Sequence, residues 1–129
     1  MGTLAEKFKR RSHEFAVRVI GLYRVLPKTE EARIIGRQLV RSATSVASNY
    51  RAVCRSRSRA EFVSKMGIVV EVADETLFWI ELLGDANIVP KDRLAGYRQE
   101  SLELSSIFAS SYHTARAGKD RNTKKTPNQ

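Results

Sequence analysis

Residues 61–83 read EFVSKMGIVVEVADETLFWIELL, and this stretch decides the fold. Its main apolar residues recur every three or four positions, which places them on one face of an α-helix. Seven further apolar residues, among them Phe78 and Trp79, leave little of the helix circumference polar. Such a helix must be covered on more than one face, by neighbouring helices or by another subunit. The main stripe consists of Phe62, Met66, Val69, Ala73, Leu77, Ile80 and Leu83.

Three further amphipathic helices flank this stretch in the sequence. Pro27 ends the first, because proline cannot donate a backbone hydrogen bond and restricts the residue before it. Thr29 is a predicted N-cap, and Ser58 with Glu61 forms a predicted capping box. Pro90 suits the first turn of the last helix. The four predicted helices span about residues 4–26, 29–54, 58–84 and 90–117.

The connections between these helices are only a few residues long. Because short links between long helices force neighbours to run antiparallel, the sequence predicts an all-α, up-and-down four-helix bundle over residues 1–117. Residues 118–129 are rich in Lys, Arg, Asn and Thr, and we expect them to form a disordered basic tail. The wide apolar surface of the third helix further predicts assembly into a homo-oligomer.

The net charge of +9 is distributed unevenly along the 129 residues. Residues 1–60 hold 14 Lys and Arg against four Asp and Glu, whereas residues 61–117 hold five against nine. The basic first half and the acidic third helix should attract each other within the fold. The surplus of positive charge predicts an anionic partner.

Cysteine usage and hydropathy predict a cytoplasmic protein. The single Cys54 cannot form an internal disulfide, so the sequence does not indicate an oxidising compartment. No stretch reaches the roughly 18 apolar residues of a membrane helix, and we expect no signal peptide or membrane association. Nearby arginines predict a lowered pKa for the Cys54 thiol, although a structural or incidental cysteine is the favoured interpretation.

The sequence offers no arrangement that is typical of an active site. His13 and His113 lie near opposite ends of the chain, and the seven glycines are too scattered to form a phosphate loop. Di-iron bundles use Glu-x-x-His motifs, whereas the segment from Glu71 to Asp74 ends in a carboxylate instead of a histidine. We therefore predict no catalytic residues, no metal, no cofactor and no enzymatic activity.

Polar side chains lie close to the apolar stripes of the second and third helices. If these helices pack antiparallel, arginines and carboxylates can meet near the middle of the bundle. The favoured interpretation is a structural polar network that sets the register of the helices, and the alternative is a carboxylate metal or acid/base site. The predicted network consists of Arg41, Ser45, Asn49, Glu71, Asp74 and Glu75.

Arginines on the first helix and around the second connection predict a positive surface for RNA or DNA. Such a surface would contact phosphates without reading bases, and a homo-oligomer would multiply it. The alternatives are a solvated basic face and a scaffold that docks another protein. The predicted nucleic-acid-binding residues are Arg10, Arg11, Arg18, Arg51, Arg55, Arg57 and Arg59.

Three segments carry a resemblance to a known family: Leu39 to Arg51, Phe62 to Met66 and Glu71 to Leu83. Over about residues 8–116 the chain resembles the bacterial four helix bundle proteins, also called 23S ribosomal RNA intervening sequence proteins. Their superfamily also contains the accessory variability protein of diversity-generating retroelements, a basic pentameric barrel that associates with nucleic acid and a reverse transcriptase. The resemblance implies a ring, commonly a homopentamer, a largely unassigned role and no catalysis. It matches Arg41, Ser45 and Asn49 to the family motif of the second helix, and Glu71, Asp74, Glu75 and Trp79 to that of the third.

Overall fold

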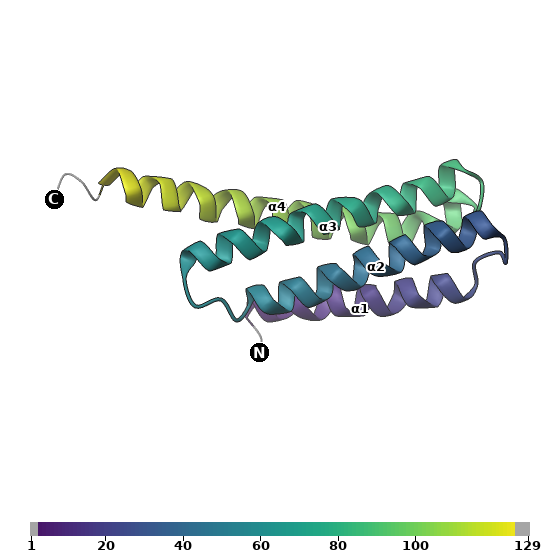
Figure 1. Cartoon of the computed structure of the whole chain (residues 1–129), viewed down its shortest axis with the longest axis horizontal. Coiled ribbons are helices and arrows are strands. Elements are labelled where there is room, and N and C mark those ends of the chain that lie inside the picture. The colour runs from purple at the N-terminus through teal and green to yellow at the C-terminus, as the bar shows by residue number, and fades with distance from the viewer. Residues whose placement is uncertain (1–2, 126–129) are drawn as a thin grey trace.

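The computed structural model describes residues 3–125, with side chains as far as Gly118. Within this range it contains no strand and four helices, and each helix runs antiparallel to the next (Figure 1). The predicted all-α, up-and-down four-helix bundle is therefore confirmed. The helices are α1 (Leu4–Arg24), α2 (Glu30–Val53), α3 (Arg59–Asp85) and α4 (Lys91–Lys125).

Side-chain caps begin the first three helices. Thr29 Oγ1 accepts from the Ala32 N–H at 3.3 Å, as the sequence predicts. Ser58 Oγ accepts from the Glu61 N–H at 3.1 Å, but the Glu61 carboxylate binds Lys65 Nζ instead of the Ser58 backbone. The complete capping box lies at α1, between Thr3 and Glu6.

The connection between α3 and α4 reverses the chain in a few residues. Asn87 adopts a left-handed backbone conformation with φ 59°, which a short polar side chain tolerates. The Ile88 N–H then donates to the Leu83 carbonyl at 3.0 Å and satisfies one of the last carbonyls of α3. The residues after this turn bring α4 back alongside α3.

The last helix is longer than the sequence analysis predicts. We expected α4 to end at residue 117 and a disordered tail to follow, but the helix continues to Lys125. Gly118 alone costs a helix only about 1 kcal/mol, and the next helix-breaking residue is Pro127. The remainder of the predicted tail, residues 126–129, lies outside the described residues.

The core lies along the axis of the bundle and draws residues from all four helices. Val19, Met66, Val69 and Ile80 are completely buried, and Phe108 of α4 is buried with them. Each such side chain contributes about 1.5 to 3 kcal/mol through removal of apolar surface from water. α3 packs against α2 and α4, and α1 packs against α2. Among the neighbouring helix pairs, α1 and α4 have the smallest contact.

None of the described helices combines the length and the apolar composition that a bilayer-spanning helix requires.

Candidate nucleic-acid interface

Four of the predicted nucleic-acid-binding arginines gather at the α2–α3 connection. Arg51 lies in the last turn of α2, Arg55 and Arg57 lie in the connection, and Arg59 is the first residue of α3. All four side chains are exposed. The N-terminus of α1 lies at the same end of the bundle (Figure 1), and the exposed Arg10 belongs to this half of α1. We call these five arginines the basic end.

Local hydrogen bonding explains why the arginines of the connection project outward. The Arg55 N–H donates to the Ala52 carbonyl and the Ser56 N–H donates to the Val53 carbonyl, both at 3.0 Å, which closes α2 with a tight turn. Ser58 then caps α3. This short turn lies at the surface of the bundle, and the arginine side chains on it are exposed.

The basic end has no acidic partner among the described side chains. The ion pairs of the described region involve Arg11, Lys65, Lys91 and Arg98, and none involves an arginine of the basic end. An exposed guanidinium presents several N–H donors in a planar fork that matches phosphate oxygens. The basic end therefore has the chemistry of a phosphate-binding surface.

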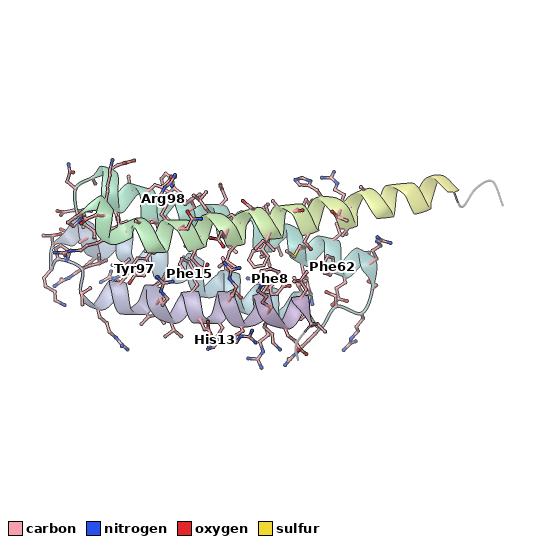
Figure 2. All side chains as sticks on the ribbon, turned by 180° about the vertical axis from the view of Figure 1, so that it is seen from behind. Phe8, His13, Phe15, Phe62, Tyr97 and Arg98 are labelled. Atoms are coloured by element: carbon pink, nitrogen blue, oxygen red, sulfur yellow. The ribbon has the colours of Figure 1, made fainter. Side chains whose placement is uncertain are left out.

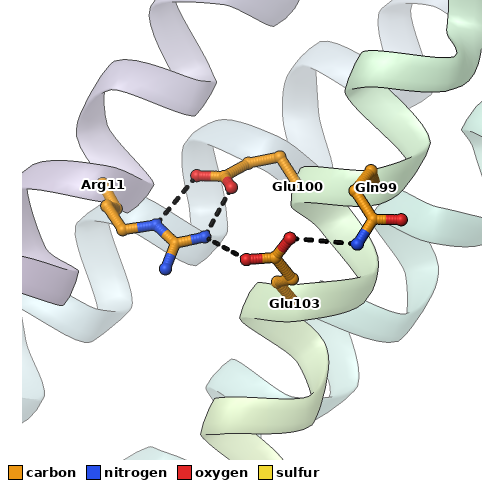
Figure 3. A network of polar contacts seen from close by, with 4 residues as sticks. All are labelled: Arg11, Gln99, Glu100 and Glu103. Atoms are coloured by element: carbon orange, nitrogen blue, oxygen red, sulfur yellow. Dashed lines mark hydrogen bonds and ion pairs between the residues drawn. The ribbon is translucent and has the colours of Figure 1, made fainter.

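Arg11, which the sequence analysis assigns to nucleic-acid binding, instead connects α1 to α4 (Figure 3). Its Nε donates to Glu100 Oε2 at 3.0 Å and its Nη2 donates to Glu103 Oε1 at 3.1 Å. Gln99 Nε2 donates to the other Glu103 oxygen at 3.0 Å, and Gln99 and Arg11 together lower the pKa of Glu103. These carboxylates occupy the guanidinium, so Arg11 is removed from the predicted surface.

Arg18 is the second predicted residue that the structure places elsewhere. Its Cζ lies 5.0 Å from the centroid of the Tyr97 ring on α4, a cation–π contact. Helical periodicity locates Arg18 on α1 but does not reveal that α4 passes beside it. Arg18, like Arg11, holds α1 against α4.

The predicted polar network between α2 and α3 does not form within the described protomer. Asn49 Nδ2 donates to the backbone oxygen of Ser45 at 2.8 Å and to its Oγ at 2.9 Å, a contact inside α2. Arg41, Glu71, Asp74 and Glu75 are exposed, and no ion pair of the described residues links the two helices. The Glu75 carboxylate instead accepts from Trp79 Nε1 at 3.2 Å. These residues form an outer surface of the bundle.

Sequence reasoning missed one cation beside the basic end. The charge of Lys9 on α1 acts to lower the pKa of the Cys54 thiol at the end of α2, the helix against which α1 packs. The one feature of the sequence that could have indicated Lys9 is its position, since it directly precedes Arg10 and is exposed on α1 as Arg10 is. The cations of α1 and the α2–α3 connection therefore belong to one end of the bundle.

Cys54 differs from its predicted electrostatic setting. Cys54 is exposed as a residue, but desolvation of its thiol raises the pKa, and the opposing effects of Lys9 and of a hydrogen bond with Tyr50 are smaller. The burial of Tyr50 itself, with a smaller effect of Cys54, raises the pKa of Tyr50 to about 12. The expected lowering by arginines is wrong, because their exposed charges are screened by water whereas the thiol loses solvation directly.

We therefore expect Cys54 to be a slow nucleophile at neutral pH. The thiolate is the reactive form, and a raised pKa reduces its fraction. Alkylation by iodoacetamide, followed by mass spectrometry from pH 7 to 10, should show a midpoint above the usual value of about 8.5 for a free thiol. The urea-unfolded chain is the control and should show the ordinary midpoint. A lower midpoint in the folded protein would contradict the burial argument.

Within the described part of the chain, no three His, Cys, Asp or Glu residues come together as a potential metal site.

Comparison with known proteins identifies the family of the chain. A family model described as 23S rRNA-intervening sequence protein matches residues 6–110. A crystal structure from Bacteroides thetaiotaomicron VPI-5482, described as a protein with unknown function from the S23 ribosomal protein family, has a TM-score of 0.75. The two chains are 31% identical, over 81% of this chain and 97% of that one. No curated protein matches the chain. Because the family model spans well over half of its length, the chain belongs to the 23S rRNA-intervening sequence protein family.

Proposed function

We propose that this protein is a non-enzymatic, homo-oligomeric, cytoplasmic protein that binds RNA or DNA through its basic end. One observation carries the proposal: exposed arginines from three successive segments lie at one end of the bundle without acidic partners among the described side chains. Elsewhere in the described bundle, Lys91 and Arg98 pair with carboxylates. Unpaired cations also lie at the other end, but the exposed carboxylates Glu30, Glu31 and Asp92 stand beside them in the chain, whereas residues 51–59 contain no Asp or Glu. The basic end therefore favours an external anion.

The contacts would be made to phosphates and not to bases. The basic end consists of arginines only, and the α2–α3 connection contains no aromatic residue on which a base could stack. Each phosphate that an arginine neutralises releases condensed counterions, so affinity falls with the logarithm of the salt concentration. Binding should therefore depend strongly on salt and weakly on base sequence.

Self-association is part of the proposal. Ile68 and Phe78 of α3 are 45% and 52% exposed, which is unusual for large apolar side chains on one helix face. A ring would place several basic ends on one assembly, and the second contact of a multivalent ligand becomes intramolecular. The family resemblance favours a homopentamer.

A protein-interaction scaffold is the second candidate. The same exposed apolar side chains favour it, because a packed protein interface removes such surface from water. The two functions differ in their response to salt, since an apolar interface does not weaken as counterions are added.

The deciding experiment compares two variants that lose the same charge at opposite ends of the bundle. Replacing Arg51, Arg55 and Arg57 with alanine should weaken binding to an RNA hairpin and to duplex DNA by about 10- to 100-fold at low salt. The slope of log affinity against log salt should become shallower by about 3. Fluorescence anisotropy at several salt concentrations measures both quantities.

The matched control replaces three exposed cations at the other end, namely Arg24, Lys28 and Arg33. This variant should retain most of the affinity and the slope, because its basic end is intact. Equal losses in the two variants would show that only net charge matters. An absence of binding by the unmodified protein at low salt would refute the nucleic-acid function and leave the scaffold.

A further inference from the structure

The contact between α1 and α4 is incomplete and leaves an apolar groove. Toward the N-terminus of α1 the two helices enclose an open groove of about 790 Å³. Figure 2 looks onto this face and shows Phe8 and Phe62 between α1 and α4. Hydroxyl groups of α4 border the groove, but its surface is mainly apolar. The apolar lining comprises Leu4, Phe8, Tyr50, Phe62, Ile107 and Phe108.

Two cations outside the ion pairs of the described residues lie beside this groove. Arg59 of α3 is one of its lining residues. Lys7 Nζ lies 5.7 Å from the centroid of the Phe8 ring, on the α1 side. An occupant that matches the groove therefore needs an apolar centre and acidic residues around it.

The chain itself carries a surface of this composition, which we call the acidic ridge. It consists of Ile68, Glu71, Glu75 and Phe78, which follow one another on α3 at intervals of three or four residues and are all exposed. Neither carboxylate takes part in an ion pair of the described residues. The ridge is also held in place, because the Phe78 and Trp79 ring centroids are 4.8 Å apart and Trp79 Nε1 donates to Glu75.

The ridge cannot reach the groove of its own protomer. α1 and α3 are diagonal in the bundle, and the ridge residues lie on the exposed side of α3. Figure 1 shows α2 and α3 on the near side of the bundle with α1 and α4 behind them, and Figure 2 shows the α1–α4 face from the opposite side. Groove and ridge therefore face different directions and can meet only between two molecules.

We propose that the acidic ridge of one copy docks into the apolar groove of a second copy, with Glu71 and Glu75 facing Lys7 and Arg59. The inference rests on the self-association in the proposed function and identifies the surfaces that produce it. Such a contact is heterologous, because the two partners use different surfaces. In a pair of copies, one still has an unoccupied groove and the other an unoccupied ridge. Further copies can therefore add through the same contact until a ring closes.

Sedimentation velocity of the full chain and two single variants tests the contact. Leu4→Asp places a charge in the groove at a side chain that is 69% exposed, and Phe78→Asp does so on the ridge. The unmodified protein should sediment as one discrete oligomer at micromolar concentration, and each variant as the 14.6 kDa monomer. Val17→Asp is the matched control at an exposed apolar residue of α1 outside both surfaces, and it should remain oligomeric. Circular dichroism should show the same helix content in all four proteins.

A mixture of the two monomeric variants distinguishes a head-to-tail contact from a symmetric one. Leu4→Asp keeps an intact ridge and Phe78→Asp keeps an intact groove, so together they should form a 1:1 dimer and nothing larger. Exchanging charges should have a parallel effect: Lys7→Glu with Arg59→Glu, or Glu71→Lys with Glu75→Lys, should each produce monomers. All four substitutions in one chain should restore the oligomer.

Each failure has a separate meaning. A monomeric unmodified protein would refute this contact together with the proposed self-association. An oligomeric unmodified protein whose Leu4→Asp and Phe78→Asp variants stay oligomeric would refute the groove–ridge contact and leave the assembly standing. Monomeric variants that do not combine in the mixture would show that the contact is not head-to-tail and would overturn the proposal.

Discussion

Replacing Phe108 with alanine should lower the free energy of unfolding by about 3 to 5 kcal/mol. The Phe108 side chain is completely buried, and its ring centroid lies 4.8 Å from that of Tyr50 on α2. The substitution removes this aromatic contact and leaves a cavity between two helices whose other side chains are already close-packed. Urea denaturation followed by circular dichroism measures the change, and the dependence on urea should keep its slope.

The control for this prediction is the same chemical change at an exposed position. Phe78→Ala removes a ring that is 52% exposed and should cost less than about 1 kcal/mol in the monomer. Both variants must be compared over a range of protein concentrations, because association adds to the apparent stability of the folded state. Equal costs for the two substitutions would contradict the described core.

The positions of the helices could be predicted from sequence because their signals are local. Thr29 at the start of α2 and Ser58 at the start of α3 cap backbone N–H groups within three residues of themselves. The error at the end of α4 has a local cause as well. Composition suggested disorder after Gly118, but a helix that is already formed extends at little cost until proline interrupts it.

The candidate site required information that periodicity does not contain. Periodicity shows which face of α1 is buried, but not that Glu100 and Tyr97 of α4 lie beside Arg11 and Arg18. The arginines of the α2–α3 connection were easier to place, because a short connection must lie at the surface. The interhelical partner of a long side chain depends on the rotation of both helices about their axes, which the sequence pattern leaves open.

The predicted polar network was wrong within the protomer for a reason that the sequence did contain. Arg41 follows Leu39 by two residues, and two residues in an α-helix turn the side chain by about 200°. Because Leu39 is buried, Arg41 must point away from the core. A residue that lies near an apolar stripe in the sequence therefore need not lie near the core. The outer surface that these residues form is available to another molecule.

Two glycine-to-alanine substitutions should change stability in opposite directions. Alanine is favoured over glycine inside a helix by about 1 kcal/mol, because glycine loses more backbone entropy on folding. At Gly21 in α1 a Cβ atom would meet nothing within 4 Å, so Gly21→Ala should raise the free energy of unfolding by about 0.5 to 1 kcal/mol. This substitution is the control for the second.

Gly36 lies where α2 passes closest to the end of α1. A Cβ atom there would lie 2.6 Å from Leu26 Cδ1 and 2.8 Å from Tyr23 Cδ1, both too short for van der Waals contact. Leu26 is buried, and the Tyr23 ring is rigid and half-buried, so both must shift within a packed region.

Overpacking costs about 1 to 3 kcal/mol, and the two simultaneous clashes favour the upper part of that range. Against the helix-propensity gain, Gly36→Ala should therefore lower the free energy of unfolding by about 1 to 2 kcal/mol. Thermal and urea unfolding of both variants measure the difference, and stabilisation by both substitutions would show that α1 and α2 are not packed closely at Gly36.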